Sequence, residues 1–124
     1  MILADTSIWV DHLRHGDAGL ARLLLAGEIA CHRFILGELA CGGIRNRAQV
    51  LSQLSALPML PDVSDLEVLT FVDQHQLMNK GLGLVDVHLL ASCMLGGTPL
   101  WTRDADLRRA VLQLGLAPQD DLSA

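Results

Sequence analysis

The sequence predicts an α/β domain built on a mainly parallel sheet with right-handed crossovers. Short apolar runs alternate with longer segments of helical periodicity along the chain. Apolar residues make up 51% of the sequence and aromatic residues only 3%, which favours aliphatic packing of helices on a sheet, with Trp9 and Trp101 in the core. The length of 124 residues suits one domain spanning residues 1–124.

The first half of the chain begins with a short apolar run and continues through four helical segments. Residues 1–4 are too few for a helix and indicate a buried strand. Thr6 and Ser7 are residue types that commonly cap the start of a helix, and Gly27 is a common helix end. In chain order we predict a strand at 1–4, a helix from 6 to about 16, a helix from 17 to 27, a strand at 28–32, a helix at 33–42, and a helix from 45 that stops before Pro58.

The second half alternates in the same way. Two glycines mark residues 78–84 as a loop, which also holds the only lysine of the chain, Lys80. Asp86 then opens a strongly apolar helix that ends at Gly96 and Gly97. In chain order we predict an extended segment at 59–60, a helix from about 64 to 77, the loop, the helix from 86, a strand at 99–102, a helix at 104–114, and a peripheral tail at 117–124.

Composition narrows the classes of function. A mean hydropathy of +0.37 excludes a disordered chain, and no apolar stretch is long enough to cross a bilayer. The formal charge of −5 argues against a general basic nucleic-acid binder. It leaves a nuclease open, because bound divalent ions reverse the field around a carboxylate cluster. No basic segment precedes the opening ILAD, so no secretory signal is expected, and Cys31, Cys41 and Cys93 indicate reduced packing residues in a cytoplasmic protein.

Carboxylates recur where predicted strands turn into helices. Asp5 follows the first strand, Asp104 follows the last, and Asp86 interrupts a buried run. A buried carboxylate is costly unless something compensates its charge. In open parallel sheets ligands bind beyond the carboxyl ends of the strands, which is where Asp5 and Asp104 fall. With Glu38 beside the apolar stripe of its helix, these acids predict a site for a hard divalent cation such as Mg²⁺ or Mn²⁺.

Each acid also has a purely structural interpretation. Asp5, Asp86 and Asp104 all suit the N-terminus of a helix, where a carboxylate caps free N–H groups. Asp106 is a further candidate ligand, although a solvated helix face explains it as well. Arg103 adjoins the last acid and is a candidate contact for an RNA phosphate.

Four segments, in order, resemble the motifs of the PIN-domain ribonucleases, and within them the toxins of VapBC toxin–antitoxin modules. ILADTSIWVDHLR resembles the first strand and helix of that family, and FILGELACG its acidic-helix motif. LGLVDVHLLASCML resembles the central helix that carries an aspartate, and LWTRDADLRRA the last strand, acid and helix. The match covers nearly the whole chain in the right order and spacing, so the ordered set is specific although no single motif is.

The resemblance implies a PIN-like three-layer α/β/α sandwich and an Mg²⁺- or Mn²⁺-dependent endoribonuclease. The acids that match the catalytic, metal-binding set of the family are Asp5, Glu38, Asp86 and Asp104. Thr6 and Thr102 match hydroxyl positions that can hold a ligand or a phosphate, whereas Asp106 falls at a more variable position. Thr6, Thr102, Asp106 and Arg103 are therefore the expected supporting residues.

The same resemblance implies partners. Members of the family act on RNA, are silenced by a cognate VapB antitoxin, and in many cases form homodimers. We expect the antitoxin-facing groove around residues 20–25 and the segments that follow, through Leu54. The chain shows no DNA-reading motif, so it is not expected to bind DNA by itself.

Two other classes of function remain as alternatives at this point: a phosphotransfer domain and a non-catalytic module. A haloacid-dehalogenase-like phosphotransfer enzyme also places an acid after its first strand, but it needs a second Asp where this chain has Ser7. A receiver domain needs a lysine at the end of a strand, whereas Lys80 lies in the glycine-containing loop. The other alternative is a non-catalytic module that keeps the PIN fold and binds RNA or protein.

Overall fold

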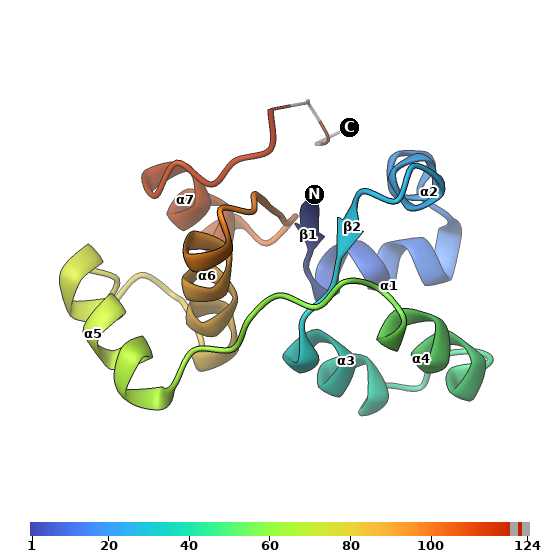
Figure 1. Ribbon diagram of the computed structural model, residues 1–124, viewed down its shortest axis with the longest axis horizontal. Helices are drawn as coiled ribbons and strands as arrows, with labels where there is room; N and C mark the ends of the chain where they lie inside the picture. Colours follow the sequence, from blue (N-terminus) through green and yellow to red (C-terminus); the bar gives the residue numbers. More distant parts are fainter. Residues whose placement is uncertain (120–121, 123–124) are drawn as a thin grey trace.

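A short, fully parallel sheet lies at the centre of the computed structural model, which describes residues 1–119 and 122 (Figure 1). Its strands are β1 (Ile2–Ala4), β2 (Ile29–Ala30) and β3 (Leu100–Trp101). They lie in the order β2-β1-β3, with Leu3 of β1 opposite Ala30 on one side and Leu100 on the other. The three predicted strands are confirmed, and each is shorter than the apolar run that predicted it. The predicted extended segment at 59–60 adds one parallel bridge, from Met59 to Cys31.

The described part of the chain has seven helices, which pack on this sheet or on one another. They are α1 (Thr6–His15), α2 (Ala18–Leu25), α3 (Arg33–Ala40), α4 (Arg47–Ser55), α5 (Asp65–His75), α6 (Leu84–Gly96) and α7 (Ala105–Gln113). In Figure 1, α1 and α2 lie on one side of the strands and α6 and α7 on the other, while α4 packs against α3 and α5 against α6. The arrangement confirms the predicted three-layer fold. Among the described residues, no helix has the length and apolar character needed to span a membrane.

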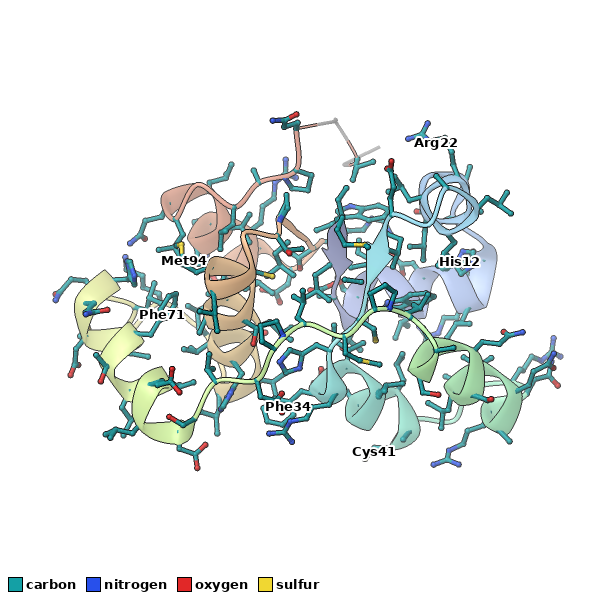
Figure 2. All side chains as sticks on the ribbon, in the orientation of Figure 1. His12, Arg22, Phe34, Cys41, Phe71 and Met94 are labelled. Carbon is teal, nitrogen blue, oxygen red and sulfur yellow. The ribbon has the colours of Figure 1, made fainter. Side chains whose placement is uncertain are left out.

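The core forms around the central strand. Leu3 and Ala4 of β1 are completely buried, and so are Ile8 of α1 and Leu90 of α6. Helix α6 has seven consecutive buried residues, 87–93, so it is enclosed on nearly every side. Figure 2 shows side chains from both helical layers filling the space around the strands. Each buried Leu or Ile side chain contributes about 1.5–3 kcal/mol relative to leaving it exposed, and this burial holds the short strands in place.

Both tryptophans lie in the core, as predicted. Trp9 and Trp101 are each 4% exposed. Neither indole N–H has a hydrogen-bond partner among the residues that the structure describes. Their rings contribute buried apolar area, and the Trp101 ring also faces the Arg103 guanidinium, whose central carbon lies 5.6 Å from the ring centroid.

Several helix ends differ from the sequence-based prediction by one or two residues, and one tail residue differs in its burial. Helix α6 begins at Leu84, two residues before the predicted Asp86, because the Asp86 carboxylate accepts a hydrogen bond from the Gly83 N–H and closes the first turn. Leu122, predicted to be peripheral, is only 8% exposed and lines the same hollow as Trp101. The prediction for residues 120, 121, 123 and 124 falls outside the described residues.

Candidate active site

Side chains from four helices or helix starts meet beyond the carboxyl ends of β1 and β3. They surround a hollow of about 170 Å³, which we call the acidic pocket. Its lining residues are Asp5, Thr6, Ser7, Glu38, Asp86, Leu89 and Asp104. The fold thus brings together all four acids named from the sequence, although the first and the last lie near opposite ends of the chain.

Asp5 is fixed at the end of the central strand. Its N–H donates to the carbonyl of Trp101 at 3.0 Å, which ties the end of β1 to β3. Its side chain accepts hydrogen bonds from the Ser7 hydroxyl at 2.5 Å, from the Ile8 N–H at 3.2 Å and from the Thr102 hydroxyl. Burial raises the pKa of Asp5 above its ordinary value, and these donors oppose part of that rise. Asp5 therefore caps α1 and also presents a well-anchored carboxylate to the pocket.

The Thr102 hydroxyl connects two of the acids. It donates to Asp5 Oδ2 and accepts the N–H of Asp104 at 3.1 Å. Asp104 in turn caps α7, since its Oδ1 accepts the Leu107 N–H at 2.9 Å. Asp104 is exposed, so its Oδ2 stays open to a ligand that enters the pocket from solvent.

Asp86 and Glu38 complete the acidic pocket. Asp86 is half-buried in the first turn of α6, and Glu38 is an exposed residue of α3 whose Oε1 accepts the Thr6 hydroxyl at 2.7 Å. The pKa of Asp86 is raised, first by burial and then by the nearby carboxylates of Asp104, Glu38 and Asp106. Carboxylates this close repel one another, and a divalent cation between them would relieve the repulsion.

Ser7 is a structural contributor that the sequence analysis missed. Its hydroxyl donates to Asp5 and accepts the N–H of Arg103 at 3.1 Å. One side chain thus joins the β1–α1 turn to the β3–α7 turn. The sequence indicated only a helix-capping residue type at this position. A hydroxyl two residues after the first acid was the available signal.

Of the four expected supporting residues, only Thr6 lines the acidic pocket, and Thr102 acts on it through its hydrogen bond to Asp5. Arg103 and Asp106 are engaged elsewhere. The Arg103 guanidinium forms ion pairs with Asp11 at 2.9 Å and with Asp17 at 2.5 Å, so its charge serves to hold α1 and α2 against β3. Asp106 pairs with Arg109 and lines a separate hollow beside α7. Both side chains are therefore engaged in ion pairs outside the acidic pocket.

The acidic pocket fits a hard divalent cation in the chemistry of its donors. All of its charged donors are carboxylate oxygens, the ligands that Mg²⁺ and Mn²⁺ prefer. In this conformation, no three acidic, histidine or cysteine side chains of the described residues lie close enough to hold an ion together. Mg²⁺ usually keeps several waters and uses only one or two carboxylates, and a hollow of about 170 Å³ has room for such waters.

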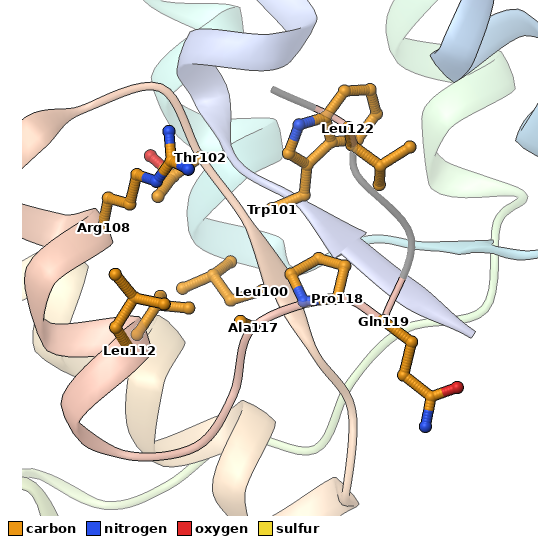
Figure 3. Close-up of a pocket in the computed structure, with 10 residues that line it drawn as sticks. Leu100, Trp101, Thr102, Arg108, Leu112, Ala117, Pro118, Gln119 and Leu122 are labelled. Atoms are coloured by element: carbon orange, nitrogen blue, oxygen red, sulfur yellow. The ribbon is translucent and has the colours of Figure 1, made fainter. Parts of the chain in front are cut away.

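A larger hollow nearby has a different character. It lies between β3, α7 and residues 117–119 and has a volume of about 270 Å³. Figure 3 shows the residues that line it. Leu100, Leu112 and Pro118 form its apolar walls, and Arg108 lies at one end. None of the four acids lines it, so the acidic pocket is the candidate active site.

Comparison with known proteins places the chain among named relatives. A family model described as the PIN domain matches residues 2–111. Ribonuclease VapC32 of Mycobacterium tuberculosis, from the strains CDC 1551 / Oshkosh and ATCC 25618 / H37Rv, is 44% identical over 124 residues, covering 99% of this chain and 100% of the relative. Among solved structures, PAE2754 from Pyrobaculum aerophilum superposes with a TM-score of 0.56 at 19% identity, covering 92% of this chain and 88% of that one. This last likeness concerns the fold alone.

Proposed function

The chain belongs to the PIN domain family, and on this basis we propose that it is a VapC-type endoribonuclease acting as the toxin of a toxin–antitoxin module. The reaction is the hydrolysis of RNA phosphodiester bonds. The observation that carries the proposal is the convergence of Asp5, Glu38, Asp86 and Asp104 on one small pocket beyond the carboxyl ends of the strands.

The proposed cofactor is Mg²⁺ or Mn²⁺, with its ligands drawn from these four carboxylates and from water. When bound, such an ion orients the phosphate, lowers the pKa of water and stabilises the charge that develops during in-line displacement. The raised pKa of Asp86 supports a cation site, because the causes include the neighbouring negative charges that a cation would neutralise.

The acidic pocket has one side formed by a buried, hydrogen-bonded carboxylate and another side formed by exposed carboxylates. Asp5 is buried and held by the hydroxyls of Ser7 and Thr102, which act as positioning residues. Glu38 and Asp104 are exposed, so RNA approaches the pocket from their side. The Thr6 hydroxyl orients the Glu38 carboxylate at 2.7 Å.

No observation favours the phosphotransfer alternative. A haloacid-dehalogenase-like enzyme uses an acid two residues after its nucleophile, but the side chain at that position, Ser7, is a hydroxyl bonded to Asp5. A non-catalytic module with this fold remains the competing function, and the experiment described below separates it from a nuclease.

The proposed protein partners are a VapB-type antitoxin and a second copy of this chain, in the cytoplasm, with no direct DNA binding by this chain alone. The antitoxin-facing groove expected around residues 20–25 needs correction, because Leu20, Leu23 and Leu54 are buried in the core and only Leu25 is widely exposed. These three leucines pack inward because their helices cover the sheet and each other.

Exposed apolar side chains on α5 and α6 support the homodimer. Leu66 and Leu69 of α5 are 73% and 62% exposed, and Leu95 of α6 is 62% exposed. Leu66 and Leu95 line one hollow between the two helices, and large exposed apolar side chains that lie together often mark a protein–protein contact.

The test of the nuclease proposal compares the wild-type protein with Asp86→Asn. Each is purified identically and incubated with single-stranded RNA in Mg²⁺, in Mn²⁺ or in a chelator. We expect wild-type cleavage only with a divalent ion and nearly complete loss of cleavage in the variant. Asn can still accept the Gly83 N–H, so the helix start is retained. Sequencing of the 5′ ends of the fragments then identifies the cleaved sites. Equal cleavage by both proteins would point to a contaminating nuclease and contradict the proposal.

A further inference from the structure

We infer that a hollow between α1, α3 and residues 42–45 is the subsite that holds the RNA nucleotide next to the cleaved phosphate. We call this hollow the side pocket. The inference rests on the proposed nuclease function and assigns the substrate contacts of the same site. Its occupant is a nucleotide of single-stranded RNA, whose unstacked bases can enter a pocket on a protein.

The side pocket adjoins the acidic pocket. Thr6 and Glu38 line both, and the Thr6 hydroxyl donates to the Glu38 carboxylate at 2.7 Å, so these two side chains form the border that the hollows share. The volumes then decide what each can hold. The acidic pocket, at about 170 Å³, is smaller than the roughly 300–1,000 Å³ of sites that enclose a small-molecule-sized group. The side pocket has about 480 Å³, which falls within that range. A phosphate fits the first, and the nucleotide attached to it needs the second.

The rim of the side pocket carries uncommitted positive charge. Arg14 and Arg45 both line it, both are exposed, and neither forms an ion pair with any described residue. Arg33 and Arg103, by contrast, are each paired with an aspartate. In a chain with a formal charge of −5, free guanidinium groups beside a cluster of acids are the groups that can attract a phosphate backbone to it.

The inner wall of the side pocket is apolar. Val10 and Leu13 of α1 line it together with Ile44, and all three are partly buried against the core. Apolar side chains can cover the faces of a base that is out of its stack. Charged groups at the rim and apolar groups inside match the two halves of a nucleotide, the phosphate and the base.

The hollow on the other flank, beside α7, lacks these features. It has about 520 Å³ but shares no lining residue with the acidic pocket. Its cations are already engaged, since Lys80 donates to Gln113 at 2.8 Å and Arg109 pairs with Asp106. The side pocket is therefore the favoured place for the neighbouring nucleotide.

The test removes the charge of the rim without touching the acids. The double variant Arg14→Ala/Arg45→Ala is compared with Arg22→Ala, which removes an exposed charge on α2. Figure 2 shows Arg22 at the edge of the molecule, and it lines neither pocket. Thermal unfolding first establishes that each variant is folded.

Two measurements follow for each protein. In cleavage of a fluorescent single-stranded RNA with Mg²⁺, the double variant should raise KM about 10-fold or more with little change in kcat, because two charge-assisted contacts made alike by bound substrate and transition state are lost. In RNA binding measured in the Asp86→Asn background, the slope of log affinity against log salt should become less negative by about 0.7 per lost phosphate contact, or about 1.4 in all. Arg14→Lys/Arg45→Lys should recover most of the slope, and Arg22→Ala should leave both quantities at the wild-type values.

The outcomes separate this inference from the proposed function. If the wild-type protein does not cleave RNA, both the proposed nuclease function and the proposed subsite are wrong. Normal cleavage with an unchanged KM and salt slope in the double variant would overturn the subsite and leave the nuclease standing. Unchanged RNA binding combined with weakened binding of the purified cognate antitoxin would make the side pocket a protein-docking surface, and the inference would be wrong.

Discussion

Replacing Thr102 by valine removes one hydroxyl while keeping the shape of the side chain. That hydroxyl donates to the Asp5 carboxylate and accepts the Asp104 N–H. Thr102 is 7% exposed and Asp5 is 5% exposed, so water cannot readily replace the lost donor. A hydrogen bond to a buried charged group contributes about 1.5–3 kcal/mol, and a partly buried N–H left without an acceptor costs about 1 kcal/mol more. We expect the free energy of unfolding to fall by about 3 kcal/mol, which lowers Tm by roughly 10 °C in a chain of this size.

The loss of stability in this variant depends on pH. The Thr102 hydroxyl is one of the donors that lower the pKa of Asp5 against the burial that raises it. Without that donor the pKa of Asp5 in the folded protein rises further, so the free energy of unfolding of the variant is lowered at pH values at which Asp5 is charged. The difference from wild type is therefore smallest below the ordinary value of 3.8, grows as pH rises through the folded pKa values, and is fully developed above them.

The assay is urea unfolding of wild type and variant at about pH 4 and about pH 8. Thr102→Ser keeps the hydroxyl and is the matched control, expected to lose only the contribution of one methyl group. A cost of Thr102→Val below about 0.5 kcal/mol, the range of a neutral surface substitution, would refute the reasoning. An equal cost at both pH values would show that Thr102 does not stabilise the charged form of Asp5.

Three further substitutions test other parts of the structure. Asp86→Asn should stabilise the metal-free protein at neutral pH, because it removes a carboxylate whose pKa is raised by burial and by its neighbours. Because the pKa of Asp86 is raised in the folded protein, Asp86 contributes stability below about pH 3.8, and this contribution is lost as pH rises through the folded pKa. The free energy of unfolding of the variant should therefore depend less on pH. Mg²⁺ should no longer stabilise the variant. Ser64→Ala breaks the capping box with Glu67 at the start of α5 and should cost about 1 kcal/mol in urea unfolding with no effect on RNA cleavage. Gly81→Ala should cost about 1–2 kcal/mol, since Gly81 has φ +75° and an added Cβ would collide with the Asp106 carboxylate.

Each of these expectations has an outcome that contradicts it. A metal-free Asp86→Asn protein less stable than wild type would mean that the carboxylate is a net stabiliser through its cap. A Ser64→Ala variant with unchanged unfolding would mean that the cap is not formed in solution. A Gly81→Ala variant as stable as wild type would mean that the loop relaxes without cost.

Local sequence signals predicted the elements that position the site. The apolar run before Asp5 and the capping aspartate itself are neighbours in sequence, so the start of α1 was predicted to the residue. Asp104 was likewise placed at the start of a helix, and α7 begins one residue later, at Ala105. Asp5, Asp86 and Asp104 were recognised as candidate ligands because a charge in or beside an apolar run is rare unless it has a purpose, although only Asp5 is buried in the structure.

Features that depend on contacts between residues far apart in the sequence could not be predicted from local sequence patterns. Arg103 adjoins the acids in sequence, yet Asp11 and Asp17 draw its side chain toward α1 and α2, and only the packing of those helices on β3 brings them within reach. Leu122 lies in a polar tail, so no periodicity marked it as a buried residue. The start of α6 at Leu84 was missed because the capping acid stands inside the helix, at Asp86, rather than before it.

The hydrogen bonds that join the β1–α1 turn to β3 have a consequence for synthesis of this protein. Asp5 emerges from the ribosome early, but its partners Trp101 and Thr102 emerge only when the chain is nearly finished. Domains generally fold as units once their strands can pair. If the chain is the proposed ribonuclease, an unfinished polypeptide has no assembled cleavage centre, and the translating ribosome and its messenger are exposed to the activity only after the last strand has been made.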